Sequence, residues 1–264
     1  MSSRLRQVLA TLTLAIVADA CFSSDSVAPS TPVDTLDAAL SEMTVPALDY
    51  ASATFSGAGI VTPPIVASRC QFDGASGAFM CDALTGNGLT LNQHFTLLDA
   101  AGSKQAAYDA KSTTGLVVNS AVSGTAVGYV GNSAVTLDVD AQQELTLGGL
   151  GTGQHTINGT SLTLTTLTYA DGSVAPLTST ITTKVVDLVM PVPAPGDPKR
   201  WPTSGMIELR STTDLGYVIP LPAASTTTSA ALEFDGSSVV KLTITTQSGT
   251  QSCRVDITTT MLGC

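Results

Sequence analysis

The sequence is poor in charged and aromatic residues. Of its 264 residues, 12% are charged and 5% are aromatic, and it contains one tryptophan and two histidines. The formal net charge is -10. Such an acidic chain repels phosphate backbones, and beyond residue 20 its only adjacent basic pair is Lys199-Arg200. The composition therefore argues against nucleic-acid binding.

The sequence motifs of common enzyme classes are also missing. It contains no H-E-x-x-H, no G-x-S-x-G and no P-loop. The stretch Gly148-Gly149-Leu150-Gly151 is not followed by a helical pattern that would cradle a phosphate. We interpret His94 and His155 as surface or packing histidines. Catalytic thiol chemistry is disfavoured because no C-x-x-C pair is present.

The acidic residues do not form a recognisable metal or catalytic motif. Asp138, Asp140 and Glu144 would supply oxygen ligands to Ca²⁺, but their spacing does not match an EF-hand loop. Alternate acids on a strand usually face solvent, and no carboxylate pair stands out for glycoside hydrolysis. We therefore expect no catalytic residue, no metal and no cofactor, and a protein that is not an enzyme.

The first twenty residues have the layout of a secretion signal. Arg4 and Arg6 precede an apolar run from Val8 to Val17, and small residues stand at Ala18 and Ala20. The apolar run of about 10 residues is too short for a bilayer-crossing helix, which needs roughly 20. We predict that residues 1–20 are a cleaved signal peptide.

The residues Ala18-Asp19-Ala20-Cys21 resemble the lipobox of bacterial lipoproteins. They also fit the A-x-A cleavage site of a plain secreted protein, which remains an alternative. Five cysteines leave one unpaired in an oxidising compartment, whereas lipidation of Cys21 leaves four that form two bridges. The chain resembles poorly characterised β-rich envelope lipoproteins. The resemblance implies a lipid attachment at Cys21, and Phe22 after it favours the outer membrane; it implies no activity.

The other four cysteines predict two disulfide-bonded hairpins. The pairs Cys70 with Cys81 and Cys253 with Cys264 have the same spacing, and each pair brackets a plausible antiparallel turn. In the first hairpin this register places Phe72 opposite Phe79. In the second it sets Val255 against Leu262 and Ile257 against Thr260. We expect both bridges to be structural.

The remaining pattern predicts an all-β fold, with antiparallel sheets arranged as a sandwich or in a barrel-like form. Strands are indicated around Leu89–Leu97, Val135–Val139, Ser161–Tyr169 and Ile181–Val189, with a β-bulge at Thr165-Thr166 where the leucine alternation slips. The expected organisation is a signal peptide (1–20), a lipid-anchored tether with a short helix ending near Met43 (21–45), a β domain (46–190), a Pro-rich loop (191–204) and a C-terminal β-meander (205–264) packed on the same domain.

These features point to a non-catalytic envelope lipoprotein that acts as a structural or interaction subunit, for example an extrinsic subunit of a membrane protein complex. Arg200 and Trp201 in the Pro-rich loop are candidate partner contacts. The alternative for Trp201 is a side chain tucked under its loop. The alternative functions are a module that binds a glycan or an apolar ligand and, third, a hydrolase.

Overall fold

The computed structural model describes residues 69–130, 133–172, 175–191, 201–215, 224–256 and 261–263. The predicted signal peptide, the lipid attachment at Cys21, the tether and its helix lie outside these residues, as do Arg200 and Cys264. Within the part of the chain that the structure describes, there is no α-helix. It therefore contains no helix long and apolar enough to cross a membrane.

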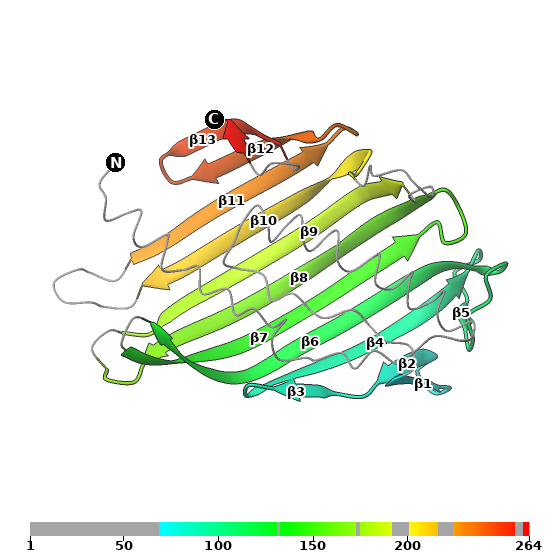
Figure 1. The fold of residues 1–264 in the computed structure, drawn as a ribbon, viewed down its shortest axis with the longest axis horizontal. Helices are drawn as coiled ribbons and strands as arrows, with labels where there is room; N and C mark the ends of the chain where they lie inside the picture. Colours follow the sequence, from blue (N-terminus) through cyan, green and yellow to red (C-terminus); the bar gives the residue numbers. More distant parts are fainter. Residues whose placement is uncertain are drawn as a thin grey trace.

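The described residues form one continuous antiparallel sheet of fourteen strands (Figure 1). The strand order is β1-β2-β4-β6-β7-β8-β9-β10-β11-β12-β13-β14, and the short strands β3 and β5 also pair with β4. The strands are β1 (Cys70–Asp73), β2 (Ala78–Cys81), β3 (Leu84–Gly86), β4 (Leu89–Asp99), β5 (Lys104–Gln105), β6 (Thr113–Val130), β7 (Ser133–Gly148), β8 (Gln154–Tyr169), β9 (Leu177–Pro191), β10 (Ser204–Leu215), β11 (Ala224–Phe234), β12 (Val239–Thr246), β13 (Gly249–Asp256) and β14 (Met261–Gly263).

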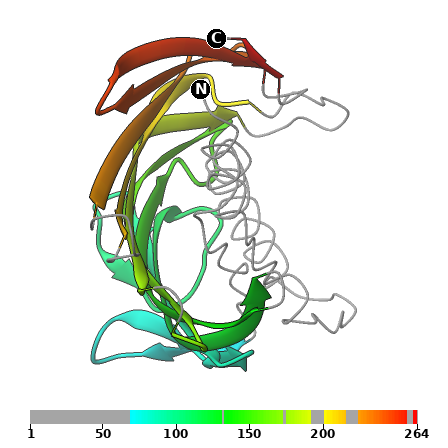
Figure 2. The same cartoon turned by 90° about the vertical axis from the view of Figure 1, so that its left-hand side faces the viewer.

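The predicted all-β, antiparallel class is confirmed. From β6 onward the strands follow one another as a meander, so each strand pairs with the next one in the chain. The sheet is strongly curved (Figure 2) but does not close into a barrel. The described strands therefore form a single open layer, in place of the two packed sheets of a sandwich.

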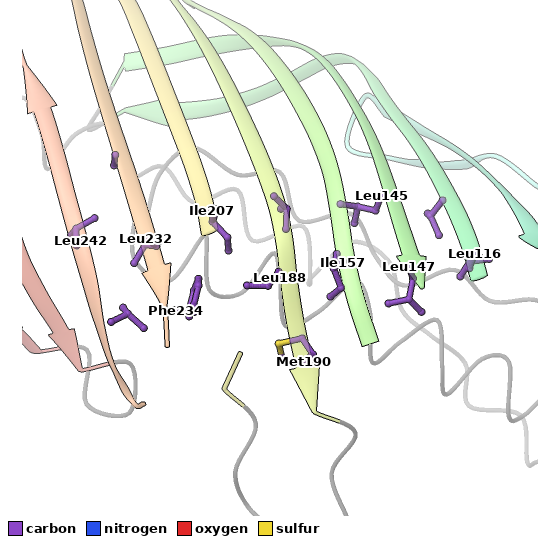
Figure 3. Packing of buried hydrophobic residues seen from close by; sticks show 14 of the residues in the cluster. Leu116, Leu145, Leu147, Ile157, Leu188, Met190, Ile207, Leu232, Phe234 and Leu242 are labelled. Atoms are coloured by element: carbon purple, nitrogen blue, oxygen red, sulfur yellow. The ribbon is translucent and has the colours of Figure 1, made fainter. Parts of the chain in front are cut away.

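One face of this sheet carries the hydrophobic core. Because side chains alternate between the two faces, residues that are paired across the strands share a face. Phe95, Leu116, Leu188 and Ile207 are almost completely buried on this face. Figure 3 shows Leu147, Ile157, Leu188 and Ile207 on neighbouring strands, and the same cluster continues to Leu242, Cys253 and Val255. We call this side, which holds the residues in register with Leu188, the hydrophobic face.

The first disulfide hairpin has the predicted register. Cys70 lies opposite Cys81 and Phe72 opposite Phe79, and the Cys70–Cys81 disulfide is formed. The ring of Phe79 stacks on Phe95 of β4, with 4.7 Å between the ring centroids. The hairpin is therefore cross-linked internally and packed against the edge of the hydrophobic core.

The C-terminal hairpin agrees with the prediction as far as the structure describes it. Val255 lies opposite Leu262 in the β13–β14 pair, and Cys253 is disulfide-bonded. Cys264, Ile257 and Thr260 lie outside the described residues. The Cys253–Cys264 pairing therefore stays a prediction.

The predicted bulge at Thr165-Thr166 is wrong. The pairing of β8 with β7 and with β9 runs without a shift through these residues. The irregularity lies instead between Ile157 and Gly159, opposite Asp187, whose φ is 46°. The Asn158 side chain accepts a hydrogen bond from the Asp187 N–H at 2.7 Å. The bulge therefore forms where a local side chain satisfies the displaced backbone.

The Pro-rich segment 191–204 does not separate two sheets. Strand β9 ends at Pro191, and residues 192–200 lie outside the described part. Strand β10 then pairs with β9 from Ser204 to Leu215. The C-terminal meander therefore continues the same sheet.

Candidate functional site

The opposite side of the sheet is lined by polar side chains. One cross-strand row on this side is continuous from β4 to β12 through paired residues. It consists of His94, Asn119, Glu144, Thr160, Lys184, Glu208, Ala231 and Thr243. We call the side that carries this row the hydrophilic face. Amide, hydroxyl and charged groups therefore stand side by side across most of the sheet.

A second row runs parallel to the first. It consists of Asn92, Ala121, Gln142, Leu162, Thr182, Arg210, Ser229 and Thr245, again linked by direct pairing. Both rows line an open hollow of about 930 Å³. Because its lining comes from the middle of long, fully paired strands, the hollow is held by a rigid backbone.

The charged groups in the hollow are balanced in sign. Its lining contains two carboxylates, Glu144 and Glu208, and two cations, Lys184 and Arg210. Lys184 is paired directly with Glu208, and Arg210 lies two residues further along β10. In a chain with a net charge of -10, this part of the surface is locally neutral.

Two of these charged side chains form no ion pair within the described sheet. Lys184 and Glu208 make no hydrogen bond or ion pair with another residue that the structure describes. The equivalent cross-strand pair Glu233 and Lys241 does close, with 3.0 Å between Lys241 Nζ and each carboxylate oxygen. Among the described residues, the Lys184 and Glu208 side chains of the hollow therefore differ from the closed Glu233–Lys241 pair.

The geometry of the hollow does not form a recognisable catalytic centre. Glu144 and Glu208 are three strands apart, so their Cα atoms are separated by roughly 14 Å, and Thr160 and Lys184 stand between them. Hydrolytic carboxylate pairs face each other at about 5–9.5 Å. The described residues contain no group of three or more His, Cys, Asp or Glu side chains that could hold a metal ion.

Of the candidate residues named in the sequence analysis, some line the hollow and others lie outside it. His94 and Glu144 line the hollow. Asp138 and Asp140 lie on the same face of β7 but outside it, and Asp138 accepts a hydrogen bond from the Thr125 hydroxyl at 2.5 Å. Trp201 is half-buried just before β10 and does not line the hollow. Its predicted role as a partner contact stays a prediction.

The clearest electrostatic perturbations lie in turns, away from the hollow. In the β1–β2 turn, hydrogen bonds from the Ser76 side chain and from the Ala75 and Ser76 backbone N–H groups lower the pKa of Asp73 below its ordinary 3.8. Similar hydrogen bonds, led by the Lys111 backbone and the Ser237 side chain respectively, lower the pKa of Asp109 and Asp235. These carboxylates order loops at neutral pH and do not mark a reactive site.

Sequence reasoning missed Lys184, Glu208 and Arg210. Each looks like an ordinary polar position of an alternating strand, and only the register shared by β7 to β10 places these residues in the lining of the same hollow as Glu144. Only a prediction of the register of each successive hairpin would have placed these residues on one surface. Comparison of the chain with protein-family models, with curated proteins and with solved structures finds no match.

Proposed function

We propose that this chain is a non-catalytic lipoprotein of the bacterial cell envelope, whose hydrophilic face binds another envelope protein. The observation that carries the proposal is the hollow across β4 and β6 to β12, where Lys184, Arg210, Glu144 and Glu208 form no ion pair with one another or with any other residue in the described ranges. Cations and carboxylates placed side by side complement a protein surface of mixed charge. A phosphate polymer would be repelled by the overall acidity.

The anchoring part of the proposal is supported by the sequence around Cys21. The predicted secretion signal, the lipobox-like Ala18-Asp19-Ala20-Cys21 and a Ser/Thr/Pro-rich segment after it support a domain held outside the cytoplasm and near the membrane. The Cys70–Cys81 disulfide is consistent with an oxidising compartment. Phe22 after the cysteine favours the outer membrane in this proposal.

The glycan-binding alternative is less well supported by the geometry. Sugar-binding surfaces commonly offer an aromatic platform, and the residues lining the hollow include no Phe, Tyr or Trp. The exposed Leu162 is the largest apolar side chain that the hollow presents to solvent. This lining favours a protein partner over a sugar.

The proposal is tested by charge reversal in the lipidated protein. The chain is expressed in its own host, extracted with mild detergent, and its size is measured by sedimentation. The wild-type protein is expected in an assembly larger than a dimer, and the double variant K184E/R210E is expected to be released from it. Loss of two interfacial cations should weaken binding by at least about tenfold.

The matched control reverses charges on the same face but outside the hollow. Lys241 belongs to a closed exposed ion pair, and Arg254 is an exposed residue of the peripheral strand β13. K241E/R254E makes the same change in net charge and should leave the assembly intact. A wild-type protein that sediments only as monomer or dimer contradicts the proposal, and so does equal release by both double variants.

A further inference from the structure

Among the described residues, the end of β6 is a strand edge that no other strand pairs with. Strand β4 covers β6 only as far as Gly124, and the last contact is the hydrogen bond from the Thr125 N–H to the Gly88 carbonyl at 3.1 Å. Beyond it, Ala126–Val130 pair with β7, and no other strand in the described part of the chain pairs with them. Figure 1 shows the β6–β7 hairpin extending past the start of β4 at the lower left.

The direction of the Thr125 N–H fixes which backbone groups face this free edge. In an antiparallel strand, the N–H and C=O of one residue point to the same side, and the side alternates along the chain. The β6–β7 pairing has no register shift from Gly115 to Val130. Val127 and Tyr129 therefore present their backbone groups outward, and Gly128 bonds toward β7. These outward groups make no hydrogen bond to another residue that the structure describes.

The edge also lacks the usual protection against strand pairing. Natural edges carry charged residues or proline, or they are very short. The segment Ala126–Val130 has neither charge nor proline. Val127 is 75% exposed, the highest value among the exposed large hydrophobic residues. By contrast, the strands at the two ends of the sheet, β1 and β14, have four and three residues.

We propose that two copies of this chain pair edge to edge through Ala126–Val130 of β6, forming one antiparallel sheet across a twofold axis at Gly128. With Gly128 opposite its own copy, Val127 lies opposite Tyr129 of the second copy. Both residues have outward backbone groups, so all of these groups in the two copies become paired. The absence of charge on this segment lets two acidic chains meet without repulsion.

The twofold register makes a specific cross-linking prediction. Gly128 faces its copy at a position without hydrogen bonds between the two residues, where Cα atoms are about 4.5 Å apart. That separation suits a disulfide. A Cβ added at Gly128 meets nothing within 4 Å, so a cysteine fits there. G128C in the membrane-anchored chain should therefore form a covalent dimer on mild oxidation, read on a non-reducing gel.

Val127 provides the matched control. It is more accessible than Gly128, but in this register the two Val127 residues are diagonal neighbours roughly 7–8 Å apart. V127C should cross-link much less than G128C. If V127C cross-links as well as G128C, the dimers arise from random collisions and the proposed register is wrong.

A second measurement does not depend on cysteine chemistry. V127P removes an outward N–H that β7 does not use, so the hairpin should fold while pairing between copies is lost. Sedimentation of the purified chain should show a dimer for wild type and V127T, and at least about a tenfold larger dissociation constant for V127P. Circular dichroism confirms that V127P is folded. A wild-type chain that is monomeric at about 100 μM overturns the proposal.

Discussion

Leucine is buried on one face of the sheet and exposed on the other. Leu188 of β9 lies on the hydrophobic face and has no exposed surface, whereas Leu162 of β8 lies on the hydrophilic face and is 46% exposed. The neighbour of Leu162, Thr163, is the buried residue at that point of β8. Register, and not hydrophobicity alone, therefore decides which side chains form the core and which line the hollow.

The largest effect should come from truncating a leucine on the hydrophobic face. L188A leaves a cavity in the core and should lower the free energy of unfolding by about 2–5 kcal/mol. L162A removes the same atoms from a half-exposed site and should cost less than about 1 kcal/mol. Urea denaturation of both variants measures the difference. Equal losses would mean that the two faces are not distinguished by burial.

Two glycines provide a smaller contrast between the faces. A Cβ on Gly159, on the hydrophobic face, would lie 2.3 Å from the Glu144 carbonyl oxygen and 2.6 Å from the Leu145 side chain. G159A should therefore cost about 1–3 kcal/mol. A Cβ on Gly148, on the hydrophilic face, meets nothing within 4 Å, so G148A should leave stability unchanged or slightly higher. Thermal unfolding of the two variants checks this, and an equally destabilised G148A would refute the contrast.

The smallest expected change in stability distinguishes two cross-strand Glu–Lys pairs of the hydrophilic face, Glu233 with Lys241 and Glu208 with Lys184. Lys241 and Glu233 form an exposed ion pair, with side chains 54% and 48% exposed. K241A should lower stability by about 0.2–1 kcal/mol, and the loss should shrink in high salt. K184A removes no ion pair to a residue in the described part of the chain, so it should leave stability close to wild type. Denaturation at low and high salt separates the two, and a salt-dependent loss for K184A would show that Lys184 is already paired.

The sequence was most informative where a short-range constraint fixed the register. Cys70 and Cys81, with Phe72 and Phe79 between them, define one antiparallel pairing, and the structure has that pairing. The β4 and β7 strands were similarly indicated by the alternation around Leu91 and Val139. Period-2 patterns and local turns act within a few residues, so one sequence contains them.

The hollow depends on information that no single strand contains. Glu144 and Lys184 lie in one cross-strand row, and Arg210 lies in the next row, only because of the registers of successive hairpins. The bulge was predicted at the wrong position because the leucine spacing within β8 was interpreted without its neighbouring strands. The leucine slip between Leu164 and Leu167 reflects a change of face, since Leu164 is an exposed residue of the hydrophilic face. Hydrophobic alternation predicts faces only when every leucine is buried.

The proposed binding role of the hydrophilic face is tested most directly by site-specific photo-cross-linking in intact cells. A photoreactive residue replaces Thr182 in the hollow, or Ser252 on the same face of β13 outside it. The account predicts a discrete protein adduct at Thr182, its loss in K184E/R210E, and little or none at Ser252. No adduct at Thr182, or the same adduct at both positions, would contradict it.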